Sequence, residues 1–278
     1  MHTLASLTAI ILVSFGTSFE SSRQATIVAV EHEVRAAYPD AYVTSAYTST
    51  MIRKKLLARD GTKVFSVDEA LADAAKRGCT RVVLQPTHLM YGLEYNEMRE
   101  LAAPYESQFE QVAFGAPLLA TPEDISAVLS ALAQANPLEK KQALVLMGHG
   151  TEHFSNFLYA ATDYQAKQEG HPNIFVGTVE AYPACADVIA LVKAAKYKKV
   201  VLAPLMLVAG DHAVNDMAGD EDDSWKSQFM KAGFAVDTRV KGLGEYPEVR
   251  ALYLAHLADA LSALDAAADG KTAKEKPE

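Results

Sequence analysis

The stretch VVLAPLMLVAGDHAVNDM, from Val200 to Met217, joins a buried-strand pattern to a cluster of small polar residues. A second stretch, VVLQPTHLMYGLEYNEM from Val82 to Met98, lies 118 residues earlier. Both contain V-V-L-x-P, then an apolar run and a glycine, and a run of this kind bounded by turn residues is typical of a buried strand. In this alignment Glu94 corresponds to His212. The sequence therefore predicts the same strand end twice, with a different ionisable group on each.

Two further pairs of segments support an internal repeat. ILVSFGTS matches VLMGHGTE 134 residues later, which aligns Phe15 with His149. YVTSAYTS matches FVGTVEAY 133 residues later, which aligns Tyr47 with Glu180. Three successive strand ends are thus predicted to carry Phe15, Tyr47 and Glu94 in the first half, and His149, Glu180 and His212 in the second.

Strand-like apolar runs alternate with helical patterns along the chain. The first run is Ala9–Phe15, and the helical pattern after it ends at Pro39. Ser66 and Glu69 have the spacing of a capping box, and Thr121 precedes a proline as a helix N-cap does. Eight Val/Ile/Leu-rich runs alternating with helices predict an α/β fold with parallel strands and helices on both faces.

The length of 278 residues suits two domains of roughly 100–150 residues. The repeat divides the chain into an N-terminal α/β half at 1–121 and a C-terminal half at 122–268. The second half would carry the metal site, and its final helix is a candidate to pack on the first half. Residues 269–278 have no apolar periodicity and are predicted to be a disordered tail.

Composition and charge exclude several classes of partner. The formal net charge is −9, which argues against nucleic acid and anionic membranes because both require a basic face. The apolar start lacks the basic residues and cleavage site of an export signal and is too short for a membrane span. Cys79 and Cys185 lie far apart without C-x-x-C spacing, which is typical of buried thiols in a reducing cytoplasm. We therefore expect a cytoplasmic protein, and a homo-oligomer is compatible with the sequence.

His149, Glu180 and His212 form the predicted metal site. In an open α/β sheet the ligand binds beyond the carboxyl ends of the strands, where all three residues are expected. Two imidazoles and one carboxylate suit a divalent first-row metal and leave positions open for a substrate. A single histidine at a strand end is more often an ordinary loop residue. Three such groups at successive strand ends favour the metal site.

Other polar segments leave two interpretations open. The basic run MIRKKL either is a solvated helix face or clamps substrate carboxylates, with Arg53 best placed for bidentate contact. The acidic run Asp220–Asp223 is interpreted as the start of a helix, capped by Asp223 or Ser224, rather than as a weak cation site. His88 is expected to be a hydrogen-bonded core residue, and His153 at most supports the metal site.

The motifs LVSFGTS, TSTMIRKKL, MGHGT, GTVEAYP and PLMLVAGDHAVNDMAGDEDDSW resemble the anaerobic sirohydrochlorin cobaltochelatases of cobalamin synthesis, in the class II chelatase superfamily. The similarity runs from about Ala9 to Leu264. It implies two flavodoxin-like (Rossmann-like) parallel-sheet halves, related by a pseudo-twofold axis, with a tetrapyrrole in the cleft between them. The family's metal-site His, Glu and His fall on His149, Glu180 and His212. Some relatives bind haem, but Asn96 stands where the haem-ligating histidine would be sought, so no haem is predicted.

The expected activity is therefore insertion of Co²⁺ into sirohydrochlorin. No nucleotide is expected, because the chain has no G-x-x-x-x-G-K-[ST] loop. His149, His212 and Glu94 are the candidate catalytic residues, and Phe15, Tyr47 and Arg53 the candidate substrate-binding residues. The alternatives are an iron chelatase for sirohaem, because the ligands do not choose between Co²⁺ and Fe²⁺, and a non-catalytic metal or tetrapyrrole carrier.

Overall fold

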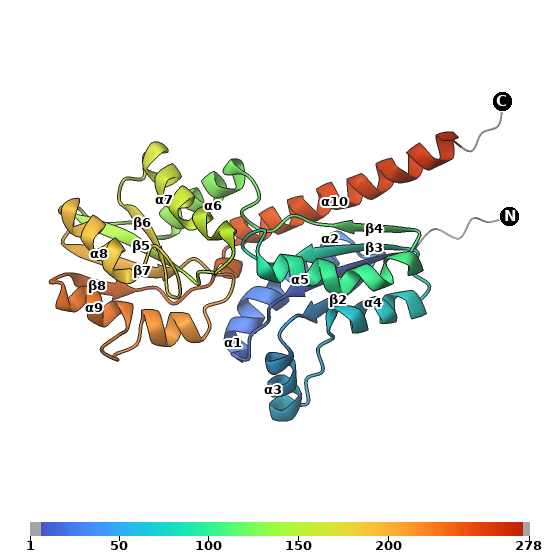
Figure 1. Cartoon of the computed structure of the whole chain (residues 1–278), viewed down its shortest axis with the longest axis horizontal. Coiled ribbons are helices and arrows are strands. Elements are labelled where there is room, and N and C mark those ends of the chain that lie inside the picture. The colour runs from blue at the N-terminus through green and yellow to red at the C-terminus, as the bar shows by residue number, and fades with distance from the viewer. Residues whose placement is uncertain (1–6, 275–278) are drawn as a thin grey trace. The chain divides into compact units, whose positions relative to one another are not determined.

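The computed structural model describes residues 7–274 and divides the chain into two compact units (Figure 1). Unit 1 comprises the described parts of 1–18, 27–118 and 250–278, and unit 2 comprises 19–26 and 119–249. Both units are discontinuous in sequence, in contrast to a single division at residue 121. The last helix belongs to unit 1, and a short segment after the first strand belongs to unit 2.

Unit 1 is built on a four-stranded parallel sheet with the order β2-β1-β3-β4. Alternate apolar residues of β1 and β3 pack against α4 and α5. Six consecutive residues of β1 are buried, so both faces of the central strand are covered, as predicted for a parallel sheet. The elements are β1 (Thr8–Ser14), α2 (Ala29–Ala37), β2 (Tyr42–Tyr47), α3 (Thr50–Asp60), α4 (Val67–Lys76), β3 (Arg81–Pro86), α5 (Leu93–Ala102), the 3₁₀-helix η2 (Ala103–Gln108), β4 (Gln111–Phe114) and α10 (Pro247–Lys274).

Unit 2 repeats this arrangement in a parallel sheet with the order β6-β5-β7-β8. Its central strands pack against α8 and α9, the counterparts of α4 and α5. The elements are α1 (Glu20–Arg23), α6 (Pro122–Ala135), β5 (Gln142–Gly148), the 3₁₀-helix η3 (Phe154–Asn156), α7 (Phe157–Gln168), β6 (Ile174–Thr178), α8 (Cys185–Ala194), β7 (Lys199–Pro204), the π-helix η4 (His212–Met217), α9 (Trp225–Lys231), β8 (Ala235–Thr238) and the 3₁₀-helix η5 (Leu243–Glu245); the π-helix η1 (Gln24–Val28) joins the units.

The sheets confirm the α/β prediction and the eight strands. Both follow the first four strands of the flavodoxin order 2-1-3-4. The bounds of β1 and β5 differ by 134 residues and those of β3 and β7 by 118, which are the offsets found in the sequence.

The third offset is wrong by two residues. In unit 1 Ser14 pairs with Tyr47, and in unit 2 Gly148 pairs with Thr178. Because Gly148 is the counterpart of Ser14, the counterpart of Tyr47 is Thr178 and not Glu180. A shift of two residues keeps every side chain on the same face of a strand, so the apolar pattern could not reveal it.

The predicted helix starts are confirmed. Ser66 and Glu69 form the capping box of α4, and Thr121 caps α6 with Pro122 at its first position. The tail differs from expectation, because α10 continues to Lys274 instead of ending before Asp269. Residues 275–278 of the predicted tail lie outside the described residues. Among residues 7–274, no helix combines the length and apolar character needed to cross a membrane.

Candidate metal site

The three predicted ligands follow three neighbouring strands of unit 2. His149 comes directly after β5, Glu180 two residues after the end of β6, and His212 in the loop beyond β7. Parallel strands place their carboxyl ends at one edge of the sheet. The two histidines follow β5 and β7, the strands between which the chain reverses its direction of winding, and ligands bind at such switch points.

The ligand atoms of these three side chains lie within 4.8 Å of one another. The Nε2 atom of His149 is 3.7 Å from Glu180 Oε2, and the Nε2 atom of His212 is 3.9 Å from Glu180 Oε1. The two imidazole rings meet edge to face, with centroids 4.6 Å apart. Bonds of about 2.0–2.2 Å place two ligands of one ion roughly 3–3.5 Å apart, so small side-chain rotations would complete a common coordination sphere.

Hydrogen bonds on the far side of each ring aim both Nε2 atoms at this space. The Nδ1–H of His149 donates to the carbonyl of Gly150 at 2.8 Å, and the Nδ1–H of His212 donates to Asp216 Oδ2 at 2.6 Å. A proton on Nδ1 leaves the Nε2 lone pair free for a metal ion.

Asp216 is a contributor that sequence reasoning missed. It lies four residues after His212 within η4, so both side chains fall on one side of the helical turn. The signal was present as an Asp at i+4 from a His. Carboxylates that orient a ligand histidine in this way also raise its basicity as a ligand.

The site is open to solvent. The side chains of His149, Glu180 and His212 are 45%, 55% and 33% exposed. Three protein ligands leave further coordination positions for a substrate, in contrast to the closed four-ligand sphere of a structural site. This arrangement can hold a divalent cation and present it to a second molecule.

Glycine is required at 150 by both backbone and space. Gly150 has φ +92°, and a Cβ there would lie 2.8 Å from Ala181 Cβ and 2.9 Å from Ala181 N. Ala181 belongs to the loop after β6, next to Glu180. The absence of a side chain at 150 therefore lets the two ligand-bearing loops touch.

We expect Gly150→Ala to destabilise the protein by roughly 2–4 kcal/mol, combining left-handed strain with overpacking. Urea unfolding measures this change. Gly170→Ala is the matched control, because Gly170 has φ +85° but a Cβ at that position would meet no described atom within 4 Å. Gly170→Ala should lose only the strain, about 1 kcal/mol. Equal losses in both variants would contradict the close loop contact.

The remaining predicted residues belong to unit 1. Phe15 directly follows β1 and is 52% exposed, so its ring can contact a ligand. Tyr47 is only 1% exposed and packs on Gly16, so the predicted contact of its ring with substrate does not fit this structure. The reason is the register described above, in which Tyr47 matches the buried Thr178.

Glu94 and Arg53 both lie on helices of unit 1. Glu94 is half-buried in the first turn of α5. Arg53 lies on α3, where its Nη1 is 3.4 Å from Glu69 Oε2 and its side chain is 22% exposed. The helix-face interpretation of MIRKKL is therefore correct for α3, and a carboxylate ligand would compete with Glu69 for Arg53.

The other polar candidates have structural partners or are buried. Ser224 caps α9 by accepting from Ser227 N, as expected for the acidic run, while Lys226 and Lys231 lower the pKa of Asp220 and Asp222. The Nδ1 of His153 accepts from Ser155 N at the start of η3.

His88 and the two cysteines are buried. His88 lies just beyond β3, and burial lowers its pKa to about 4. Neither of its ring nitrogens has a hydrogen-bond partner in the described part of the chain, so the expectation of a hydrogen-bonded residue was wrong. Cys79 and Cys185 are free and buried, and burial raises the pKa of Cys185 to about 12, which makes it a poor metal ligand.

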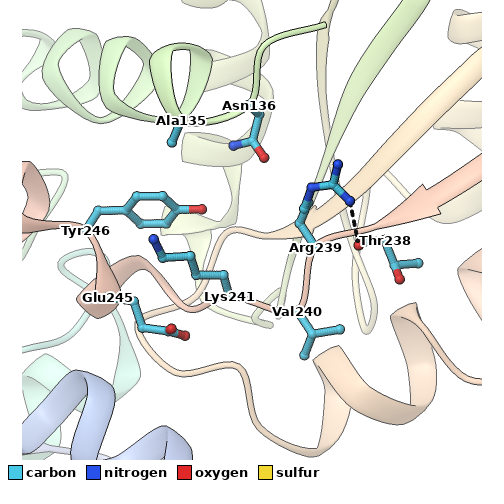
Figure 2. Close-up of a pocket in the computed structure, with 8 residues that line it drawn as sticks. All are labelled: Ala135, Asn136, Thr238, Arg239, Val240, Lys241, Glu245 and Tyr246. Carbon is cyan, nitrogen blue, oxygen red and sulfur yellow. Dashed lines mark hydrogen bonds between the residues drawn. The ribbon is translucent and has the colours of Figure 1, made fainter.

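A separate hollow of about 400 Å³ lies beyond β8 in unit 2 (Figure 2). The Nζ of Lys241 lies 4.1 Å from the ring centre of Tyr246, and Arg239 donates to the carbonyl of Thr238. Two cationic side chains would repel a metal cation. The hollow contains none of the predicted site residues; its lining is Ala135, Asn136, Thr238, Arg239, Val240, Lys241, Glu245 and Tyr246.

The fold and the site together define a class of protein: a two-unit α/β protein whose second unit carries ligands suited to a divalent metal ion. The chain matches the family described as Cobalt chelatase (CbiK) over residues 8–262. It therefore belongs to the cobalt chelatase (CbiK) family, which confirms the resemblance seen in the sequence.

Individual relatives agree with this assignment. The sirohydrochlorin cobaltochelatase of Salmonella typhimurium is 38% identical over 255 residues, which cover 91% of this chain and 96% of that protein. The sirohydrochlorin cobaltochelatase CbiKC of Nitratidesulfovibrio vulgaris is 32% identical over 263 residues, with coverage of 92% and 91%. The solved structure of SirB from Bacillus subtilis with Fe³⁺ has a TM-score of 0.63 at 14% identity, covering 91% of this chain and 95% of that one, and so shares the fold.

Proposed function

We propose that this chelatase inserts Co²⁺ into sirohydrochlorin in anaerobic cobalamin biosynthesis. The observation that carries the proposal is the open set of His149, Glu180 and His212, with both Nε2 atoms directed at one space. The family and the names of two relatives supply the identity of the metal and of the tetrapyrrole.

The proposed reaction exchanges one divalent cation for two pyrrole N–H protons, so charge is conserved. His149, Glu180 and His212 hold the incoming ion while it loses water ligands. As nitrogen atoms of the macrocycle replace protein ligands, the freed imidazoles and carboxylate become available to accept the departing protons. Phe15 offers an exposed aromatic surface for the macrocycle, and Glu94 is a candidate proton acceptor.

The proposal includes neither nucleotide nor haem. The chain lacks a G-x-x-x-x-G-K-[ST] loop, and Asn96 replaces the histidine that a haem would require. We also propose that the protein works in the cytoplasm, which the two free buried cysteines support. The tetrapyrrole is the only partner that the proposal requires, and a homo-oligomer is compatible with it.

Steady-state turnover with sirohydrochlorin tests this function. Absorbance changes of the macrocycle should report catalysed insertion of Co²⁺ without added nucleotide. Faster insertion of Fe²⁺ than of Co²⁺ at equal free concentration would instead identify a sirohaem chelatase, because the ligand set accepts both ions. Stoichiometric metal binding without turnover would identify a carrier.

The possible carboxylate clamp at Arg53 gives a separate prediction. Sirohydrochlorin carries many carboxylates, and Arg53→Ala should raise KM for it by up to about tenfold with a smaller change in kcat, because a clamp distant from the metal contributes uniform binding. Arg35→Ala is the control, since Arg35 also pairs with a glutamate on a helix of unit 1. If Arg53→Ala lowers only stability, Arg53 serves the contact with Glu69 alone.

A further inference from the structure

The loops that carry His149 and Glu180 are joined at several points within unit 2. Glu180 N donates to the carbonyl of His149 at 2.9 Å, and Val179 N donates to that of Gly148 at 3.0 Å. Gly150 then approaches Ala181 too closely for any side chain at 150. These contacts set the starting separation of the two ligands.

Asn156 makes a side-chain link between the same loops. Its Oδ1 accepts from Thr151 N at 3.1 Å, two residues after His149. Its Nδ2 donates to the carbonyl of Tyr182 at 2.6 Å, two residues after Glu180. One amide group therefore ties both ligand-bearing loops.

Asn156 also precedes α7 at the N-cap position, where an asparagine side chain normally accepts a hydrogen bond from the first turn of the helix. Its backbone has φ −55° and ψ −26°, and its side chain makes no such capping bond. The amide is used between the loops instead of at the helix end. Loss of Asn156 should thus affect the loops more than α7.

We propose that Asn156 is a positioning residue that holds Glu180 at coordinating distance from His149. This inference rests on the proposed metal site. Without the link, the loop after β6 can move outward beyond Ala181, and the 3.7 Å separation between His149 Nε2 and Glu180 Oε2 is no longer maintained. Groups that orient metal ligands in this way typically contribute 10–100-fold to metal affinity.

The test measures Co²⁺ binding to the full chain by titration and by the visible absorption of the bound ion, which reports coordination geometry. Asn156→Ala should weaken binding about tenfold or more and alter the spectrum, with little change in the far-UV circular dichroism. Asn215→Ala is the matched control, because Asn215 lies close to His212 in sequence but its side chain donates to Asp211, within the same loop. It should bind Co²⁺ as the wild type does.

A third variant separates failure of this inference from failure of the metal site. If His149→Ala loses Co²⁺ binding while Asn156→Ala retains the wild-type affinity and spectrum, the metal site stands and the positioning role is overturned. If neither variant changes binding, the proposed metal site itself is wrong. Should Asn156→Ala fail to fold, Asn156→Ser replaces it, because the serine hydroxyl is too short to reach the Tyr182 carbonyl, and the same outcomes apply.

Discussion

Replacement of His149 or His212 by alanine is expected to reduce Co²⁺ insertion at least 100-fold, the largest effect that we predict for any single side chain. Each substitution removes one of three ligands together with a proton acceptor at the same position. Both side chains are partly exposed, so their removal leaves no large cavity and the fold should persist. The rate of insertion into sirohydrochlorin, measured at saturating substrate, checks the prediction.

His171→Ala is the matched control for both variants. His171 belongs to unit 2, and it donates and accepts hydrogen bonds through its backbone, which an alanine retains. Its insertion rate should equal that of the wild type, and all three variants should unfold at similar temperatures. Near-normal insertion in both His149→Ala and His212→Ala would remove the metal-site assignment.

The sequence predicted the fold class and the grouping of these ligands because both depend on strand ends. Apolar runs marked all eight strands, and the carboxyl ends of parallel strands share one edge. His149 and His212 could therefore be expected to meet although they are far apart in the chain. The relation between β3 and β7 was also correct, since V-V-L-x-P gives an unambiguous alignment.

The register of the second pair of strands could not be predicted from the apolar pattern. Strand side chains alternate with period two, so an alignment that slips by two residues matches as well as the correct one. Tyr47 was consequently paired with Glu180 and expected at the substrate, whereas it pairs structurally with Thr178 and is buried. Hydrogen-bonded pairing between strands is the information that the sequence lacks.

Side chains that orient the ligands were also missed. Asp216 had a recognisable spacing from His212, but Asn156 had no such signal. Its partners are a backbone N–H at Thr151 and a backbone carbonyl at Tyr182, and backbone groups have no residue type for a sequence motif to specify. Such contacts become visible only when the turn geometry is known.

Glu94 gives the second large prediction. It aligns with His212 in the repeat, yet the other strand ends of unit 1 carry Phe15, which cannot bind a metal, and the buried Tyr47. Among the residues that the structure describes, the one set of three metal-ligand side chains within close reach is that of unit 2. We therefore expect Glu94 to act on the protons or the orientation of the tetrapyrrole and not on the cation.

Glu94→Gln retains the shape of the side chain and removes its charge. Insertion should slow by about 100-fold, the lower end of the range for loss of a general base, while Co²⁺ binding to the free protein stays within a few-fold of wild type. The competing explanation is that Glu94 only stabilises the first turn of α5 through the helix dipole, which is worth at most about 1 kcal/mol of stability. Glu100→Gln, on the same helix beyond its first turn, is the control and should insert Co²⁺ normally. A normal rate for Glu94→Gln with a small loss of stability would favour the helix-start role, whereas loss of Co²⁺ binding would make Glu94 a metal ligand.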